Sequence, residues 1–250
     1  KAGIFRSNQP AIVGLEDAPA TVYQQAQVLE VSELIVAGRD YKLEQGAKSW
    51  SWFRSRSGRQ ADIRLIGLPL SLIPIQNIAT ALATLSALQV SLDANLVRST
   101  LAQLTLPGRM QVLNASPLRM VDVAHNPHAV AYLVQALNNH DIFSEFGDLH
   151  VVVAMMKDKD ISETLSLIKD KVAKWYLAPL SDNPRAASVA QMQQALLALD
   201  KAGMQDKIET YDSISQAWKA AKAAQNQDTL LLGFGSFYTV AEILGSESGQ

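Results

Sequence analysis

The second half of the chain alternates between short apolar runs and amphipathic stretches. The apolar runs are rich in Val and Leu and predict strands at residues 119–123, 150–154, 175–178 and 229–233. Apolar residues at helical spacing predict helices at residues 127–138, 161–172, 188–202 and 214–224. Strands that alternate with helices form a parallel sheet covered on both faces, so this half predicts an α/β, Rossmann-like domain.

The first half has a more mixed pattern. Apolar runs predict strands at residues 11–14 and 34–38, and helical spacing predicts helices at residues 19–29, 74–88 and 93–104. Alternating apolar and polar residues after the Ser-, Arg- and Gly-rich stretch at 50–59 predict an antiparallel hairpin with one face in water. Pro107-Gly108-Arg109 interrupts the pattern, and we place the domain boundary there, with domains at 1–106 and 107–250.

Composition limits the class of protein. The 250 residues suggest one large or two modest domains, and 48% apolar with 18% charged residues is typical of a soluble globular protein. The formal net charge is -2, so we expect no nucleic-acid partner. The apolar runs are shorter than the roughly 18 residues of a membrane-spanning helix. The absence of cysteine excludes disulfides and thiolate metal sites, and we expect a cytoplasmic protein.

Candidate chemistry follows the predicted strand at 119–123, where the sequence reads Asp-Val-Ala-His-Asn-Pro-His-Ala from Asp122 onward. Ligands bind at the carboxyl ends of strands in open α/β sheets, and an acidic residue there can hold ribose hydroxyls. The alternative is that Asp122 is a cap and Asn126-Pro127 a turn. The residue types alone leave both interpretations open.

Several motifs occur in an order that resembles the folate–glutamate ligases of the Mur ligase superfamily (dihydrofolate synthase/folylpolyglutamate synthase). Each motif is weak alone, but together they run from residue 1 to about residue 244. They are residues 1–6, 77–82, 107–109 and 122–129, and Gly235-Ser236-Phe237 followed by Thr239-Val240. The resemblance implies a partial Mur-ligase-type central domain followed by a Rossmann-like C-terminal domain with a mostly parallel sheet.

The resemblance also implies ATP contacts: Asn77 near the base, Arg109 at the phosphates and Asp122 on the ribose. A guanidinium suits phosphate because it stays charged and forks onto two oxygens. Without the resemblance, Arg109 would be interpreted as a surface arginine beside a turn, and Asn77 as a polar residue at a helix start.

On the side of the incoming glutamate, the resemblance implies His125 and Ser236, with His125 also stabilising charge near the transferred phosphate. Ser236 has an alternative role as a helix N-cap, and both roles are compatible because a helix N-terminus favours a carboxylate. Lys1 resembles the lysine that the family carbamylates to make a ligand for Mg²⁺. His128 departs from family variants that carry an acidic residue there, and no role is assigned to it.

The implied reaction uses ATP and Mg²⁺. ATP phosphorylates a carboxylate of dihydropteroate or of a folate's terminal glutamate, and the amine of L-glutamate then displaces phosphate. The resemblance favours the bifunctional form of the enzyme and implies a monomer, while the sequence leaves open whether the protein makes dihydrofolate, polyglutamates or both. No phosphate loop of the type G-x-x-x-x-G-K-[ST] occurs, and no Gly-Lys pair at all. We therefore expect a C-terminal part that is inactive alone; the alternative is a non-catalytic nucleotide- or partner-binding fragment.

Two other enzyme classes fit the sequence less well. Gly233 to Tyr238 approaches a dinucleotide-binding fingerprint, but Tyr238 replaces the third glycine. Ser236, His125 and Asp122 are the residue types of a hydrolase triad, but Ser236 lacks the G-x-S-x-G context.

Overall fold

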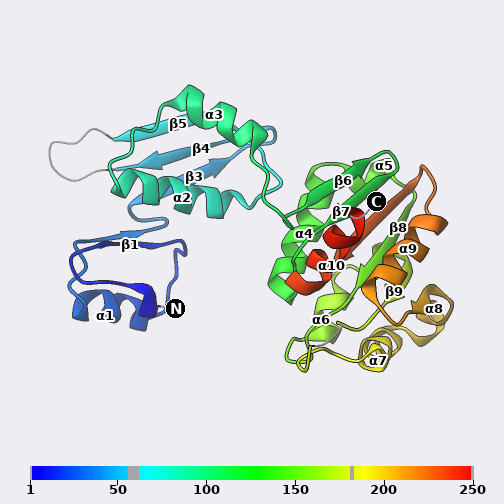
Figure 1. Ribbon diagram of the computed structural model, residues 1–250. Coiled ribbons are helices and arrows are strands. Elements are labelled where there is room, and N and C mark those ends of the chain that lie inside the picture. Colours follow the sequence, from blue (N-terminus) through cyan, green and yellow to red (C-terminus); the bar gives the residue numbers. More distant parts are fainter. Residues whose placement is uncertain (1, 56–61, 181–182, 249–250) are drawn as a thin grey trace. The chain divides into compact units, whose positions relative to one another are not determined.

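The computed structural model describes residues 2–55, 62–180 and 183–248. The chain divides into two compact units, Lys1–Thr105 and Leu106–Gln250 (Figure 1). Lys1 and residues 56–61 of the predicted hairpin lie outside the described residues. No helix within the described residues is both long and apolar enough to cross a membrane.

Within residues 2–55 and 62–105, the first unit combines two small sheets with helices. β1 (Pro10–Val13) and β2 (Glu33–Val36) pair in parallel around α1 (Ala20–Val28). The second sheet is antiparallel and packs against α2 (Ile75–Ala87) and α3 (Ala94–Gln103). Its strands lie in chain order: β3 (Tyr41–Gln45), β4 (Ser49–Arg54) and β5 (Ile63–Pro69).

Alternation along β4 explains the core of this unit. Trp50 and Trp52 point to the buried face, whereas the residues that alternate with them, Ser49, Ser51 and Phe53, are half-buried. Ile78 and Leu82 of α2 pack in the same apolar cluster. Burying side chains of this size contributes roughly 1.5–3 kcal/mol each, which holds the helix on the sheet. The predicted antiparallel pairing with one wetter face is confirmed for the described part of the hairpin.

The second unit, over residues 106–180 and 183–248, is built on a sheet of six strands. The spatial order is β10-β9-β8-β11-β7-β6, and every pairing is parallel except that of β6 with β7. The strands are β6 (Gln111–Ala115), β7 (Leu118–Val121), β8 (Asp148–Val153), β9 (Val172–Leu177), β10 (Ile208–Thr210) and β11 (Thr229–Phe234). The predicted mostly parallel sheet is confirmed.

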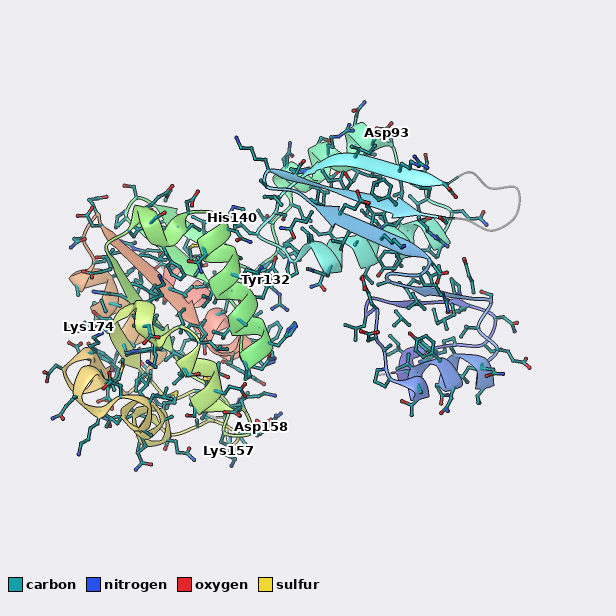
Figure 2. All side chains as sticks on the ribbon, turned by 180° about the vertical axis from the view of Figure 1, so that it is seen from behind. Asp93, Tyr132, His140, Lys157, Asp158 and Lys174 are labelled. Carbon is teal, nitrogen blue, oxygen red and sulfur yellow. The ribbon has the colours of Figure 1, made fainter. Side chains whose placement is uncertain are left out.

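Helices cover both faces of this sheet. Trp218 of α9 and Ile243 of α10 are buried in one apolar cluster with residues of β7, β8, β9 and β11. Figure 2, seen from behind, shows α4 and α6 in front of the sheet, whereas α9 and α10 are in front of it in Figure 1. The helices are α4 (Pro127–Asn139), α5 (Ile142–Glu145), α6 (Ile161–Ser166), α7 (Val189–Leu199), α8 (Lys201–Met204), α9 (Ile214–Ala224) and α10 (Phe237–Ser248).

Two predicted helices are shorter than expected. The helix predicted at 161–172 ends at Ser166, because Val172 already belongs to β9 and pairs with Leu149 of β8. The helix predicted at 188–202 breaks at Asp200, whose backbone is extended and whose carboxylate accepts a hydrogen bond from the Gly203 amide as the cap of α8. Strands β3, β6 and β10 were not predicted, because they are short or lack a continuous apolar run.

Candidate active site

The candidate site begins where the three central strands of the second unit end. β8 is followed by Ala154, β11 by Gly235 and β7 by Asp122. The Asp122 amide donates to the Gly233 carbonyl at 2.9 Å, and the Gly235 amide donates to the Ala124 carbonyl at 3.0 Å. The segments that follow β7 and β11 are therefore joined to each other by backbone hydrogen bonds beyond the ends of the strands.

A buried carboxylate positions the loop that carries Arg109. Asp122 is only 8% exposed, and its two oxygens accept hydrogen bonds from the Met110 amide at 2.8 Å and the Ala124 amide at 2.7 Å. Met110 has a φ of 40°, a left-handed conformation that is strained for a residue with a side chain. The bond to Asp122 stabilises that conformation, so Asp122 determines where the preceding Arg109 lies.

Gly108 fits the same loop closely. It has a φ of 69°, and a Cβ there would lie 2.8 Å from Cγ1 of Val123. Its carbonyl accepts a hydrogen bond from the Val123 amide at 2.8 Å. Arg109 is therefore an exposed side chain on a loop whose backbone is fixed on both sides.

The environment of Asp122 opposes its ionisation. Burial raises the pKa of Asp122, and the hydrogen bonds from the Met110 and Ala124 amides, with the charges of Arg109 and His125, reverse only part of that effect. The pKa of Tyr132 on α4 is raised to about 12, first by burial and then by the negative charge of Asp122. Asp122 therefore interacts electrostatically with Arg109, His125 and Tyr132.

The raised pKa gives a prediction for stability against pH. As pH rises, Asp122 loses its proton in the unfolded chain before it does so in the folded protein. Its contribution is therefore fully present below the unfolded pKa and is lost as pH rises through the folded pKa. We expect the stability of the wild type relative to Asp122→Asn to decrease between about pH 4 and the raised pKa, and then to level off.

Hydrogen exchange of β7 and β11 amides in both proteins measures this difference for the second unit alone. A difference that stays constant, or that grows with pH, would contradict the assignment.

His125 lies half-buried just after β7. Its Nδ1 is 2.9 Å from the Val123 carbonyl oxygen. A carbonyl can only accept, so Nδ1 carries the proton and donates it, which leaves Nε2 of the neutral ring with a free lone pair. Within the described residues, Nε2 of His125 has no protein hydrogen-bond partner.

Ser236 is both a helix cap and a buried hydroxyl. It is 4% exposed, and its Oγ accepts a hydrogen bond from the Thr239 amide at 3.0 Å. Thr239 donates its own hydroxyl proton to the Ala154 carbonyl at 2.8 Å. The 2.7 Å contact between the two hydroxyls must therefore be donated by Ser236. Ser236 is therefore the N-cap of α10, as expected. Its hydroxyl proton is already donated to Thr239, so its oxygen can only accept a further hydrogen bond.

Two residues of this network, Thr239 and Phe237, lie in a motif identified from the sequence, but no role was predicted for either. Thr239 ties α10 to the end of β8, and its spacing from Ser236 is the N-cap to N3 spacing of a helix start. Phe237 lies beside Arg109 and His125. Phe237 belongs to the same motif, but an aromatic residue at a helix start is usually an ordinary apolar residue, so no role was inferred for it.

Further charged side chains follow β8. Lys157 donates to the Pro184 carbonyl at 3.0 Å, and Arg185 pairs with Asp158 at 3.1 Å. Figure 2 shows Lys157 and Asp158 at one end of the second unit and His140, at the C-terminal end of α4, at the other. These charged side chains therefore follow the end of β8, and Asp158 pairs with Arg185 there.

The structure gathers four of the six predicted site residues in the second unit: Arg109, Asp122, His125 and Ser236. Asn77 belongs to the first unit, where it is exposed in the first turn of α2. Lys1 lies outside the described residues. Among the described residues, no group of three or more His, Asp or Glu side chains is placed to hold a metal ion.

Comparisons with known proteins identify the class. The family model of the Mur ligase, glutamate ligase domain, matches residues 108–237, which include the Arg109 loop, Asp122, His125 and Ser236. The match covers about half of the chain, and the fold is the mostly parallel sheet expected for that domain. The chain belongs to the Mur ligase family.

Within that family, the chain is similar to the dihydrofolate synthase/folylpolyglutamate synthase of Escherichia coli (strain K12). The two are 38% identical over 245 residues, which cover 98% of this chain and 53% of the relative. The family and fold inferred from the motifs are thus confirmed. The chain spans about half the length of the curated relatives it matches.

Solved structures agree with this placement. Escherichia coli FolC in complex with DHPP and ADP matches with a TM-score of 0.81 and 35% identity, over 99% of this chain and 55% of that one. The bifunctional folylpolyglutamate synthase/dihydrofolate synthase from Yersinia pestis, complexed with AMPPNP and Mn ion, matches with a TM-score of 0.79 and 34% identity, over 98% and 54%.

Proposed function

We propose that this chain supplies the C-terminal part of an ATP-dependent ligase that joins L-glutamate to dihydropteroate, to folate (poly)glutamates, or to both. The observation that carries the proposal is the Arg109 loop. The exposed guanidinium of Arg109 precedes Met110, whose left-handed backbone is held by buried Asp122 just after β7, within the residues that the family model matches. The relatives' names, together with ADP and AMPPNP in the similar structures, support ATP as the phosphate donor.

The reaction that we propose has two steps. The γ-phosphoryl group of ATP passes to a carboxylate oxygen of the pterin or folate substrate, which gives an acyl phosphate and ADP. The amine of L-glutamate then attacks the acyl carbon, the C–O bond to phosphate breaks, and the amine loses a proton as the amide forms. Such transfers depend mainly on positioning and on charge over the phosphates.

Arg109 is proposed to hold the phosphates, because a guanidinium binds two phosphate oxygens at once and keeps its charge. Asp122 is proposed to reach the ribose through the lone pairs that its two backbone hydrogen bonds leave free. Asn77 is proposed to contact the base. We also propose that residues 1–106 are part of the ATP-binding central domain and that residues 107–250 are the C-terminal domain.

His125 and Ser236 are proposed to serve the incoming glutamate. The free Nε2 of His125 can accept a proton from the attacking amine or, when protonated, donate to a phosphate oxygen. The Ser236 hydroxyl donates to Thr239, so it can accept from the glutamate ammonium group but cannot donate to the carboxylate without rotating. The carboxylate is better placed at the backbone amides of the first turn of α10.

Mg²⁺ would neutralise charge on the phosphates of ATP. The described residues contain no cluster that could hold it. Lys1, which resembles a carbamylated metal-ligand lysine, is outside them, so its role stays a proposal and no step of the reaction is derived through the metal.

A ligation assay tests the proposal. We expect the complete gene product to release ADP and phosphate only when ATP, L-glutamate and a pteroate or folate acceptor are all present. The 250-residue chain alone should bind nucleotide weakly and ligate nothing, because it contains no phosphate loop.

The acceptor series separates the possible reactions: dihydropteroate reports on dihydrofolate synthesis, and a folate monoglutamate on chain extension. Ligation by the 250-residue chain would refute the proposal that this chain is a C-terminal part that is inactive alone. A complete gene product that binds ATP but accepts no glutamate would favour the non-catalytic alternative.

A further inference from the structure

We propose that Phe237 is a positioning residue, whose ring holds the Arg109 guanidinium and the His125 imidazole in place before substrates bind. The inference rests on the proposed function, in which these two side chains serve the phosphates and the incoming glutamate. It assigns a role to a residue that would otherwise be an exposed aromatic at the start of a helix.

Arg109 is restrained by the ring. Its Cζ lies 5.4 Å from the Phe237 ring centroid, within the roughly 6 Å over which a cation is attracted to an aromatic face. Apart from its electrostatic attraction to Asp122, the guanidinium has no hydrogen bond or ion pair among the described residues. Its hydrogen-bonding groups therefore stay available for a ligand while the aromatic contact limits the motion of the side chain.

His125 contacts the same ring. The two centroids are 6.2 Å apart with planes inclined by 47°, a tilted arrangement in the range that aromatic pairs prefer. The Nδ1 bond to Val123 fixes one edge of the imidazole, and the Phe237 contact restricts rotation about that bond. Together they orient Nε2, the nitrogen that is free to exchange a proton.

The ring itself is anchored through its backbone. Phe237 directly follows Ser236, whose hydroxyl is held by Thr239, and Thr239 is held by the Ala154 carbonyl. The ring is nevertheless 58% exposed, so the core does not account for it. The backbone of Phe237 is thus held in place while its ring stays exposed, as expected of a residue that positions neighbouring side chains.

Tyr238 provides a matched control. It is the next residue on α10 and is 57% exposed, almost the same fraction as Phe237. No ring or cation contact of Tyr238 occurs among the described residues. Removing its ring therefore takes away a similar exposed aromatic without disturbing Arg109 or His125.

The first readout is structural and independent of activity. In NMR spectra of the 250-residue chain, ring currents from Phe237 should shift the Arg109 Nε–H and His125 ring-proton signals. We expect Phe237→Leu to abolish these shifts, and Phe237→Tyr and Tyr238→Leu to retain them. Melting curves of all variants should agree with that of the wild type, because the substituted rings are exposed.

The second readout is kinetic and uses the complete gene product. We expect Phe237→Leu to lower kcat/KM for ATP about two- to fivefold, the factor that corresponds to losing one exposed cation–π contact. The value of kcat should also fall, because His125 loses the ring that orients its Nε2. Phe237→Tyr should restore wild-type behaviour, since its ring has the same aromatic face, and Tyr238→Leu should have no effect.

Unchanged Arg109 and His125 signals in Phe237→Leu would overturn the inference, and so would lost shifts with unchanged kinetics. If the complete gene product ligates no glutamate in any variant, the proposed function fails. The NMR comparison would still decide whether the ring positions the two side chains.

Discussion

Arg109→Ala is expected to lower the kcat of ATP-dependent glutamate ligation by about 10²–10³-fold, the loss typical of removing one preorganised group from a developing negative charge. The structure supports an effect of this size because the guanidinium is exposed, and its loop is fixed by Asp122 and Gly108. A side chain that is already in place stabilises the transferred phosphoryl group without further ordering. Steady-state kinetics of the complete gene product, with ATP as the varied substrate, measure the change.

Two variants sharpen this result. Arg109→Lys keeps the positive charge but cannot bind two phosphate oxygens at once as a guanidinium does. This variant should therefore retain only part of the activity. Arg119→Ala removes a guanidinium from the same unit, but from β7, where Arg119 donates to the Gln225 side chain at 2.8 Å. Arg119→Ala should leave kcat within about twofold of the wild type. The hydrogen bond that it removes contributes to the stability of the folded unit and does not contact the proposed phosphate site. An Arg109→Ala enzyme no more impaired than Arg119→Ala would exclude a role for Arg109 at the phosphates.

Gly235→Ala should destabilise the second unit by about 2–4 kcal/mol. Gly235 has a φ of 118°, which residues with a Cβ rarely adopt. A Cβ there would lie 2.5 Å from the Ala154 carbonyl oxygen and 2.9 Å from Cγ2 of Val153. Neither neighbour can move easily, because both belong to the end of β8 in the centre of the sheet. Urea unfolding followed by hydrogen exchange of β8 and β11 amides measures the loss.

Gly245→Ala is the matched control. Gly245 lies in the same helix that follows Gly235, has no atom within 4 Å of a built Cβ, and has no positive φ. Alanine favours the helix over glycine by up to about 1 kcal/mol, so this variant should be neutral or more stable. If both substitutions changed the free energy of unfolding by less than about 0.5 kcal/mol, the prediction that a Cβ at position 235 clashes with the Ala154 carbonyl would be contradicted.

Local patterns predicted most of the fold, for identifiable reasons. The Val- and Leu-rich runs that became β8, β9 and β11 are buried on both faces of a parallel sheet, so their apolar character is continuous and easy to detect. Asn126 and Ser188, which cap α4 and α7, carry the side chains that favour such positions. Where a tertiary pairing competed with helical spacing, as at Val172, the pairing decided the outcome.

The candidate site was predicted less completely. Arg109, Asp122, His125 and Ser236 were identified because motifs resembling one family contain them, not because spacing shows that they meet. The sequence could not indicate that Asp122 holds Met110, or that Ser236 donates to Thr239. Phe237 lies in one of these motifs, but its contact with Arg109, a residue 128 positions earlier in the chain, could not be predicted from the sequence.

The sequence by itself therefore determined the family and most of the alternation of strands and helices, and it supplied the candidate residues for the chemistry. Only the tertiary structure decided that β11 lies between β8 and β7, so that the ends of these strands meet. The reason is physical: periodicity reports which face of an element is buried, which is a local property. Strand order and the contacts at strand ends depend on pairing between distant segments, and no local pattern encodes that pairing.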